Sequence, residues 1–250
     1  MPRRPDPPKR PLRARPAERR QAKTPAAAVA TTADIVARIT TAVLEHRLKP
    51  GAKLGEEHLG EIFGVSRTLV RQALFQLAKQ KLVVLHAGRG AFVAQPTVQE
   101  ARELFEARRV IERALVWRFT QTATAAQLGQ LRAHLKRERD ALAAGDLQAG
   151  TRLSGEFHLR IAACAGNGVL SELLHDLVSR SSLILLVYGS SLPPSCSVDE
   201  HGKLLASIEA RNADAALRLM TQHLDHIERG LNLKGSGDSM DDLRVALGPA

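Results

Sequence analysis

The order of apolar patterns between residues 56 and 94 constrains the fold of this chain more than any other feature of its sequence. Two short amphipathic helix patterns are separated by Gly64 and are followed at once by two strand patterns, at residues 82–86 and 91–94. Ser66 stands at the start of the second helix pattern, where its hydroxyl can cap free backbone N–H groups. This order predicts a unit of helix, turn, helix and β-hairpin.

A further helix pattern precedes this unit. Ile35, Ile39 and Val43 recur at helical spacing, and Pro50-Gly51 marks a turn after them. Three short helices followed by a hairpin form a winged helix-turn-helix, so we expect that fold over residues 31–95. Such a module binds DNA by placing a recognition helix in the major groove.

The third helix of this module carries the polar groups that DNA recognition requires. Arg67 and Arg71 are four residues apart and share one helix face, from which they can reach guanine or phosphate oxygens. The alternative is a solvated face with local ion pairs, for which Glu61 is the acid that we expect to be available in the preceding helix. The hairpin tip can offer one more guanidinium to the minor groove. The predicted DNA-binding residues are Ser66, Arg67, Thr68, Arg71, Arg89 and Gly90.

Positive charge is concentrated in the N-terminal part of the chain. Residues 1–30 contain nine Lys/Arg and two Asp/Glu, and residues 31–95 contain nine and five, whereas residues 96–234 contain seventeen and sixteen. This asymmetry favours a polyanion as the partner of the N-terminal part. Residues 1–30 are rich in Pro and Arg and too poor in apolar residues to form a core. We expect a disordered basic arm that either contacts DNA or serves as a solubilising leader.

The rest of the chain is expected to be helical. Six helix patterns follow one another after residue 97, and only 3% of all residues are aromatic, which suits aliphatic packing between helices. Thr124 and Gln127 form a capping-box pair at the start of the second pattern. The predicted fold class is therefore mainly α, with a winged helix-turn-helix, an all-helical bundle of about six helices over residues 96–232, and a flexible tail at 233–250.

Two features exclude other classes of protein. The chain has two cysteines, Cys164 and Cys196, so a disulfide scaffold is excluded and a reducing cytoplasm is the expected compartment. It has no apolar run of membrane-spanning length, and no apolar segment follows the basic N-terminus. We therefore expect neither a membrane partner nor a secretory signal.

The run LKPGAKLGEEHLGEIFGVSRTLVRQALFQLAKQKLVVLHAGRGAFV resembles the DNA-binding domain of GntR-type bacterial transcription regulators, over about residues 35–94. Its elements LKPG, GVSRTxVRxAL and GRGxFV have the order and tight spacing of that family. The chain departs from the family at Lys81, where glycine is usual, and at Glu56-Glu57-His58, where several relatives have a phosphate-binding arginine. The resemblance implies DNA contacts from Arg67, Thr68, Arg71 and Arg89.

Three later segments resemble the FCD effector domain that follows this DNA-binding domain in one large, FadR-like GntR subfamily. They are LFEARRVIE (104–112), EFHLRIAACAGNGVL (156–170) and DEHGKLLASIEARNADAALRLMTQHL (199–224). The resemblance covers about residues 97–231. It implies a bundle that forms a homodimer and binds a small organic acid, often with a metal ion at its centre.

Three histidines on three separate predicted helices are candidate metal ligands: His158, His201 and His223. Each lies among apolar residues on an inward face, and imidazoles that converge in a bundle core suit a divalent ion such as zinc, nickel or manganese. The alternative is a set of hydrogen-bonded core histidines. The resemblance implies an aspartate ligand at the position of Ser154, so water or an effector carboxylate would have to complete the ligand set here.

One arginine is the candidate effector-binding residue. The FCD resemblance places Arg108 in the effector pocket, where its guanidinium would bind a carboxylate bidentately. Arg109 beside it is expected to pair with Glu106 or Glu112 on the surface. His226 is expected to be a surface residue.

Together these features predict a cytoplasmic transcription regulator that is not an enzyme. A homodimer would present two recognition helices to a palindromic double-stranded DNA operator, and a small carboxylate in the bundle would strengthen or weaken that binding. One alternative is a regulator that senses a metal ion alone. Another is a metal-dependent hydrolase, for which Glu156 is the candidate general base close to the histidines in sequence.

Overall fold

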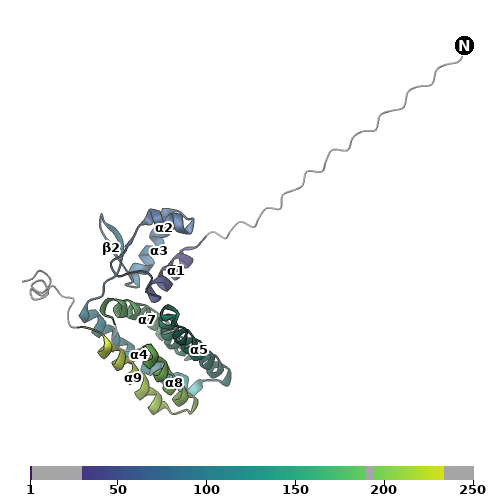
Figure 1. The fold of residues 1–250 in the computed structure, drawn as a ribbon, viewed down its shortest axis with the longest axis vertical. Helices are drawn as coiled ribbons and strands as arrows, with labels where there is room; N and C mark the ends of the chain where they lie inside the picture. The colour runs from purple at the N-terminus through teal and green to yellow at the C-terminus, as the bar shows by residue number, and fades with distance from the viewer. Residues whose placement is uncertain (2–29, 190–193, 234–250) are drawn as a thin grey trace, which may run out of the picture.

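The computed structural model describes Met1, residues 30–189 and residues 194–233 of the 250-residue chain. Within these residues an N-terminal module of three helices and a small sheet lies on one end of a body of six helices (Figure 1). The predicted mainly α fold class is confirmed. The expected basic arm and flexible tail fall almost entirely outside the described residues. The elements in chain order are α1 (Thr32–Leu44), β1 (Lys53–Leu54), α2 (Glu56–Phe63), α3 (Arg67–Lys79), β2 (Val83–His86), β3 (Gly90–Val93), α4 (Val98–Thr122), α5 (Ala125–Ala143), α6 (Leu147–Cys164), α7 (Gly168–Tyr188), α8 (Pro194–Glu209) and α9 (Ala213–Gly230).

The turn between α2 and α3 forms as the sequence predicts. α2 ends at Gly64, whose φ of 66° lies in the left-handed region that glycine adopts without steric cost. α3 begins after Ser66, whose hydroxyl accepts a hydrogen bond from the backbone N–H of Leu69. One face of α3 packs into the core of the module, so its opposite face is exposed. The buried residues of that inner face are Val70, Ala73, Leu74 and Leu77.

The sheet of the module has three strands, one more than the predicted hairpin. Its order is β1-β3-β2, and both pairs are antiparallel. Leu54 of β1 lies opposite Ala91, which in turn lies opposite Leu85 of β2. β1 contains only two residues, too few to produce a strand pattern in the sequence. It forms because β3 has a free edge beside it.

Lys81 occupies a backbone conformation that usually requires glycine. It follows α3 with a φ of 60°, and its N–H donates to the carbonyl oxygen of Ala78 at 3.1 Å. This turn directs Leu82 into the core of the module, where it is buried. A side chain in the left-handed region is sterically unfavourable, so the departure from the family's glycine weakens the module.

The helix starts in the body also follow capping signals in the sequence. In the predicted capping box of α5, Thr124 Oγ1 accepts from Gln127 N, and Gln127 Oε1 accepts from Thr124 N. Thr97 and Glu100 form a second capping box at the start of α4, and Asn212 caps α9. None of the described helices combines the length and apolar character needed to cross a bilayer.

Side chains of the body hold the N-terminal module in place. α7 lies beside α1 (Figure 1), and Leu183 of α7 is fully buried within the apolar core of the module. Arg152 of α6 pairs with Glu45 at the end of α1, at 3.1 Å. The Tyr188 hydroxyl donates to the carbonyl oxygen of Pro96 at 2.9 Å, which ties the linker between the two parts to α7. The module therefore shares packing and hydrogen bonds with the body.

Candidate DNA-binding surface and metal site

The predicted recognition residues lie on the exposed face of α3. The side chains of Arg67 and Arg71 are 62% and 60% exposed, so neither is packed inside the protein or against the helical body. Ser66 and Thr68 precede and follow Arg67 and are exposed as well. The structure thus brings these four residues together at one end of a helix, where a DNA groove can reach them.

Both arginines are paired with acids of the first turn of α2. Arg71 donates from Nε and Nη2 to the two carboxylate oxygens of Glu56, at 2.9 and 2.7 Å, and Arg67 Nη2 donates to Glu57. The hydrogen bonds from Arg71 lower the pKa of the Glu56 carboxyl and raise that of Arg71. The expectation that Glu61 would supply the acid is wrong, because the crossing of α2 over α3 places the start of α2 beside these arginines.

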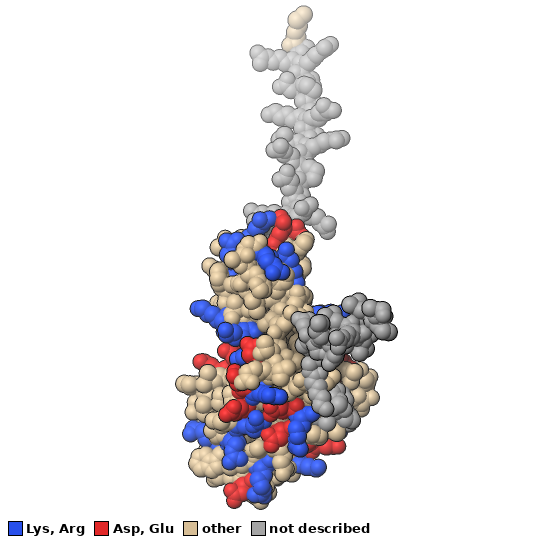
Figure 2. All heavy atoms as spheres, turned by 90° about the vertical axis from the view of Figure 1, so that its left-hand side faces the viewer, with Lys and Arg blue, Asp and Glu red and all other residues tan. Residues whose placement is uncertain are grey.

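The hairpin tip is exposed as predicted. Gly90 has a φ of 97°, and the guanidinium of Arg89 lies 5.8 Å from the centre of the Phe92 ring. On the face shown in Figure 2, basic side chains gather at the far end of the N-terminal module with acidic ones directly beside them. The face of the body below shows a mixture of both charges, which agrees with the near-neutral balance of that part of the sequence.

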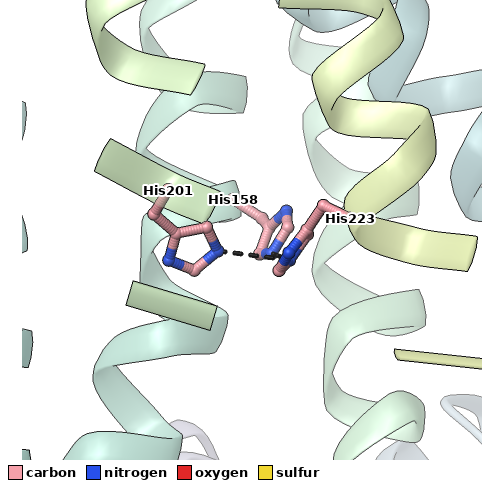
Figure 3. A group of neighbouring side chains, drawn as sticks. All are labelled: His158, His201 and His223. Carbon is pink, nitrogen blue, oxygen red and sulfur yellow. Dashed lines mark hydrogen bonds between the residues drawn. The ribbon is translucent and has the colours of Figure 1, made fainter. Parts of the chain in front are cut away.

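The three predicted metal ligands converge in the centre of the body. His158 (α6), His201 (α8) and His223 (α9) are buried, and their rings point toward one another (Figure 3). The Nε2 atom of His223 lies 3.2 Å from the Nε2 atoms of both other histidines. A ligand atom of each of the three lies within 4.8 Å of the others, and within the described residues this is the one His/Cys/Asp/Glu group found with such a geometry.

A carboxylate binds the opposite nitrogen of each ring. Nδ1 of His158 is 2.5 Å from Glu112, Nδ1 of His201 is 3.1 Å from Glu138, and Nδ1 of His223 is 2.7 Å from Glu200. These three acids were not predicted from the sequence to be partners of the histidines. A proton on Nδ1 satisfies each of these contacts and leaves the lone pair on Nε2. In that tautomer the three Nε2 lone pairs face one another, whereas a proton on Nε2 of His223 would make its 3.2 Å contacts hydrogen bonds between the rings (Figure 3).

Burial and charge set the protonation of the cluster. Burial lowers the pKa of all three histidines, that of His223 to about 4, so the rings are neutral at pH 7. Burial opposes ionisation of Glu112 as well, but the charge of Arg108 and the contact with His158 hold its pKa at about 2. Glu112 thus remains ionised beside neutral imidazoles.

These residues fit a divalent metal ion. Three neutral imidazoles with facing lone pairs repel one another unless a cation lies between them. The observed 3.2 Å between nitrogens is the spacing of neighbouring ligands that each lie about 2.0–2.1 Å from one zinc ion. Carboxylates on the outer nitrogens are also the partners that commonly orient metal-bound histidines. The cluster can therefore hold a metal ion. The ionised, buried Glu112 supplies a negative charge on the outer nitrogen of His158.

A cavity of about 420 Å³ adjoins the cluster, within the range of small-molecule sites. Arg108 lines it: Nε donates to Glu112 at 2.7 Å and Nη1 to Ser181 at 3.1 Å, whereas Nη2 is buried and has no hydrogen-bond partner among the residues that the structure describes. Ser154, at the position of the missing aspartate, also lines the cavity and shares a 3.1 Å hydrogen bond with Ser197. A buried guanidinium N–H without a partner is costly, so an acceptor placed beside it would stabilise the protein.

Three other expectations are corrected by the structure. Arg109 pairs with Asp225 and Glu228 of α9, at 3.0 and 2.6 Å, and not with Glu106 or Glu112, because it faces α9. His226 is half-buried, lines the cavity and lies 2.6 Å from Glu200. Glu156, the candidate general base, instead pairs with Arg152 at 2.6 Å.

Comparison with known protein families finds two matching family profiles. Residues 31–93 match the profile "Bacterial regulatory proteins, gntR family", and residues 103–226 match the FCD domain. This chain belongs to the GntR family. It is a DNA-binding transcription regulator of the GntR/FCD type, as predicted, and its relatives are regulators and not enzymes.

The matches to individual relatives cover most of this GntR regulator. The repressor RspR of Escherichia coli is 26% identical over 185 residues, which are 74% of this chain and 81% of that protein. The Uxu operon regulator of Haemophilus influenzae is 28% identical over 191 residues, 69% of this chain and 71% of that protein. Among solved structures, E. coli McbR/YncC has a TM-score of 0.72 at 22% identity, covering 79% of this chain and 94% of its own. That likeness shows the shared fold.

Proposed function

We propose that a small carboxylate, bound in the cavity beside a divalent metal ion, controls the binding of this regulator to DNA. His158, His201 and His223 would hold the metal through Nε2, and the ion would supply a Lewis acid for a carboxylate oxygen of the effector. Arg108 would bind the same carboxylate through Nη2. The observation that carries the proposal is that one cavity is lined both by His158, which belongs to the cluster of three histidines, and by the buried guanidinium of Arg108.

The proposed DNA contacts are the six predicted ones: Ser66, Arg67, Thr68, Arg71, Arg89 and Gly90. Arg67 and Arg71 would exchange their acidic partners on α2 for guanine or phosphate oxygens. We further propose that the protein binds a palindromic operator as a homodimer, since two-fold symmetry would present two recognition helices to two half-sites.

Arg67→Ala tests the DNA contact. DNA fragments would first be selected from a random pool with the full-length protein, and affinity would be measured by fluorescence anisotropy. We expect binding to weaken by about 1–3 kcal/mol, with relaxed preference at one base pair. Lys79→Ala is the matched control, because Lys79 is exposed on the same helix but at its other end. Equal affinity of wild type and Arg67→Ala would contradict the proposed contact.

A thermal-shift screen of small carboxylates, with and without added zinc, nickel or manganese, tests the ligand part. We expect stabilisation by a carboxylate to require the metal ion and to be lost in His158→Ala and His223→Ala. Stabilisation by the metal alone, with no carboxylate adding to it, would favour a metal-only sensor. Elemental analysis of the purified protein gives the metal content directly, and a content equal to that of the histidine variants would refute the metal site.

A further inference from the structure

The outer face of the three-stranded sheet carries a lysine that comes from its shortest strand. Lys53 of β1 is exposed, whereas its neighbour Leu54 points into the core of the module. Lys53 lies directly opposite Phe92 of β3, so the two side chains share the outer face of the sheet. The position of Lys53 therefore depends on β1, the strand that was not predicted from the sequence.

The side chain of Lys53 extends along this face toward the tip of the hairpin. A Cβ atom at Gly90 would lie 3.9 Å from Cε of Lys53, so the lysine stem passes within contact distance of the backbone there. The ammonium group is one bond beyond Cε. Arg89 is the residue before Gly90, and its guanidinium lies 5.8 Å from the centre of the Phe92 ring. Both cations thus lie next to Gly90.

These two cations are not neutralised by neighbouring acids. Within the residues that the structure describes, no acidic side chain pairs with Lys53 or Arg89. The recognition residues Arg67 and Arg71 differ, because both are paired with acids of α2. An external anion can therefore bind the cations at the hairpin directly, whereas those of α3 must first leave their partners. Unpaired cations also attract DNA over longer distances than ion pairs do.

The hairpin is placed to meet the backbone of a duplex whose major groove holds α3. β2 lies beside α3, and the hairpin points away from the helical body (Figure 1). A wing in this position would reach the neighbouring minor groove, which is about 6 Å wide and has a sugar-phosphate strand on each side. With the guanidinium of Arg89 in this groove, a cation beside Gly90 would meet a phosphate at the edge of the groove.

We infer that Lys53 is a further DNA-binding residue of this regulator, and that its ammonium group binds a backbone phosphate beside the minor groove. The inference rests on the proposed placement of Arg89 and Gly90 at DNA and adds a contact from β1. An ammonium group is a compact point charge that suits a phosphate, and phosphate contacts carry no base information. The contact therefore strengthens binding to any duplex and does not select the operator.

Lys53→Gln tests this contact by removing the charge from a side chain of similar length. The full-length protein would be titrated by fluorescence anisotropy, at several salt concentrations, with the DNA fragment selected from the random pool and with a scrambled duplex of equal length. Counterion release predicts that the salt dependence becomes shallower by about 0.9 for each Lys53 on the duplex, which weakens binding about eightfold at about 0.1 M salt. Both duplexes should lose affinity by the same factor. Lys53→Arg keeps a cation and should stay within about twofold of wild type.

Lys79→Gln is the matched control, because it removes an equal charge from an exposed position at the far end of α3. It should leave the salt dependence unchanged. An equal change in both glutamine variants would overturn the contact, since net charge alone would then account for it. Loss of affinity for the selected fragment alone would also overturn it.

The outcomes separate this inference from the recognition surface on which it rests. If Arg67→Ala weakens operator binding and Lys53→Gln has no effect, the contact from β1 is wrong and the recognition surface stands. If neither Arg67→Ala nor Lys53→Gln changes the affinity for either duplex, both are wrong.

Discussion

Glu112→Gln tests the chain of buried contacts that runs from Arg108 through Glu112 to His158. Glu112 bridges two residues that line the cavity, because one carboxylate oxygen accepts from Arg108 Nε at 2.7 Å and the other contacts His158 Nδ1 at 2.5 Å. Its side chain is 1% exposed and that of Arg108 is 4% exposed. A neutral amide of the same shape removes the charge and leaves Arg108 as a buried cation without a counter-charge.

The expected loss of stability is large. A pKa of about 2 against the ordinary 4.5 corresponds to about 3 kcal/mol of stabilisation at neutral pH. Removal of one partner from a buried ion pair costs about 3–5 kcal/mol, so both routes agree on a loss of at least about 3 kcal/mol. The amide can also donate to His158 Nδ1, which would move the ring proton to Nε2 and block the metal. We expect metal affinity to fall by about 10–100-fold.

Urea unfolding of the chelator-treated protein measures the first effect, and competition with a zinc-binding dye measures the second. Because the folded-state pKa of Glu112 is depressed, its contribution to the free energy of unfolding is complete above pH 4.5. That contribution is lost as the pH falls toward 2. The difference between wild type and Glu112→Gln should shrink over that window. Glu106→Gln, on the exposed face of the same helix, is the control. A loss below about 1 kcal/mol with unchanged zinc affinity would refute this account.

Three further variants, one of them a double substitution, test other parts of the structure. Glu56→Gln with Glu57→Gln frees the recognition arginines, so DNA binding should tighten and its dependence on salt should steepen by about 0.9 for each charge removed, measured by anisotropy at several salt concentrations. Lys81→Gly should stabilise the protein by about 0.5–1 kcal/mol in urea unfolding, because it relieves a left-handed backbone. Ser154→Asp should raise metal affinity at least about tenfold in chelator competition by supplying a carboxylate beside the cavity.

Local signals in the sequence account for most of the fold that was predicted. Ser66 and Thr124 each cap a helix at the expected position, because an N-cap depends on residues within one turn of the chain. The short strand β1 was missed, since a two-residue strand exists only through its pairing with β3. Local patterns thus define the helices, whereas pairing between distant segments cannot be read from them.

The candidate site shows the same limit. His158, His201 and His223 were found because they lie on apolar helix faces within segments that resemble the FCD domain. Their carboxylate partners were missed, because Glu112 lies 46 residues before His158 and Glu138 lies 63 residues before His201. The burial of each of these two acids could still have been predicted from the sequence of its own helix.

The signal is an acidic residue on an apolar stripe. Glu138 follows Leu131 and Leu135 at helical spacing, and Glu112 follows Leu104, Phe105 and Arg108 on the buried side of α4. An acid at such a position is buried only when it is paired, so it predicts a partner even where the sequence cannot name it.

The continuous chain from Arg108 through Glu112 to His158 would couple the proposed effector binding to the proposed metal binding. A carboxylate on Arg108 would compete with Glu112 for the positive charge of the guanidinium, and a metal ion held by His158 would polarise the imidazole and strengthen its bond to Glu112. Each proposed ligand would therefore act on the same carboxylate from opposite ends. Since coupling between two binding equilibria is reciprocal, the factor by which the metal changes effector affinity must equal the factor by which the effector changes metal affinity. Under the proposed function the three residues Arg108, Glu112 and His158 would act as one binding unit, so a substitution of any of them should change the affinity for both ligands.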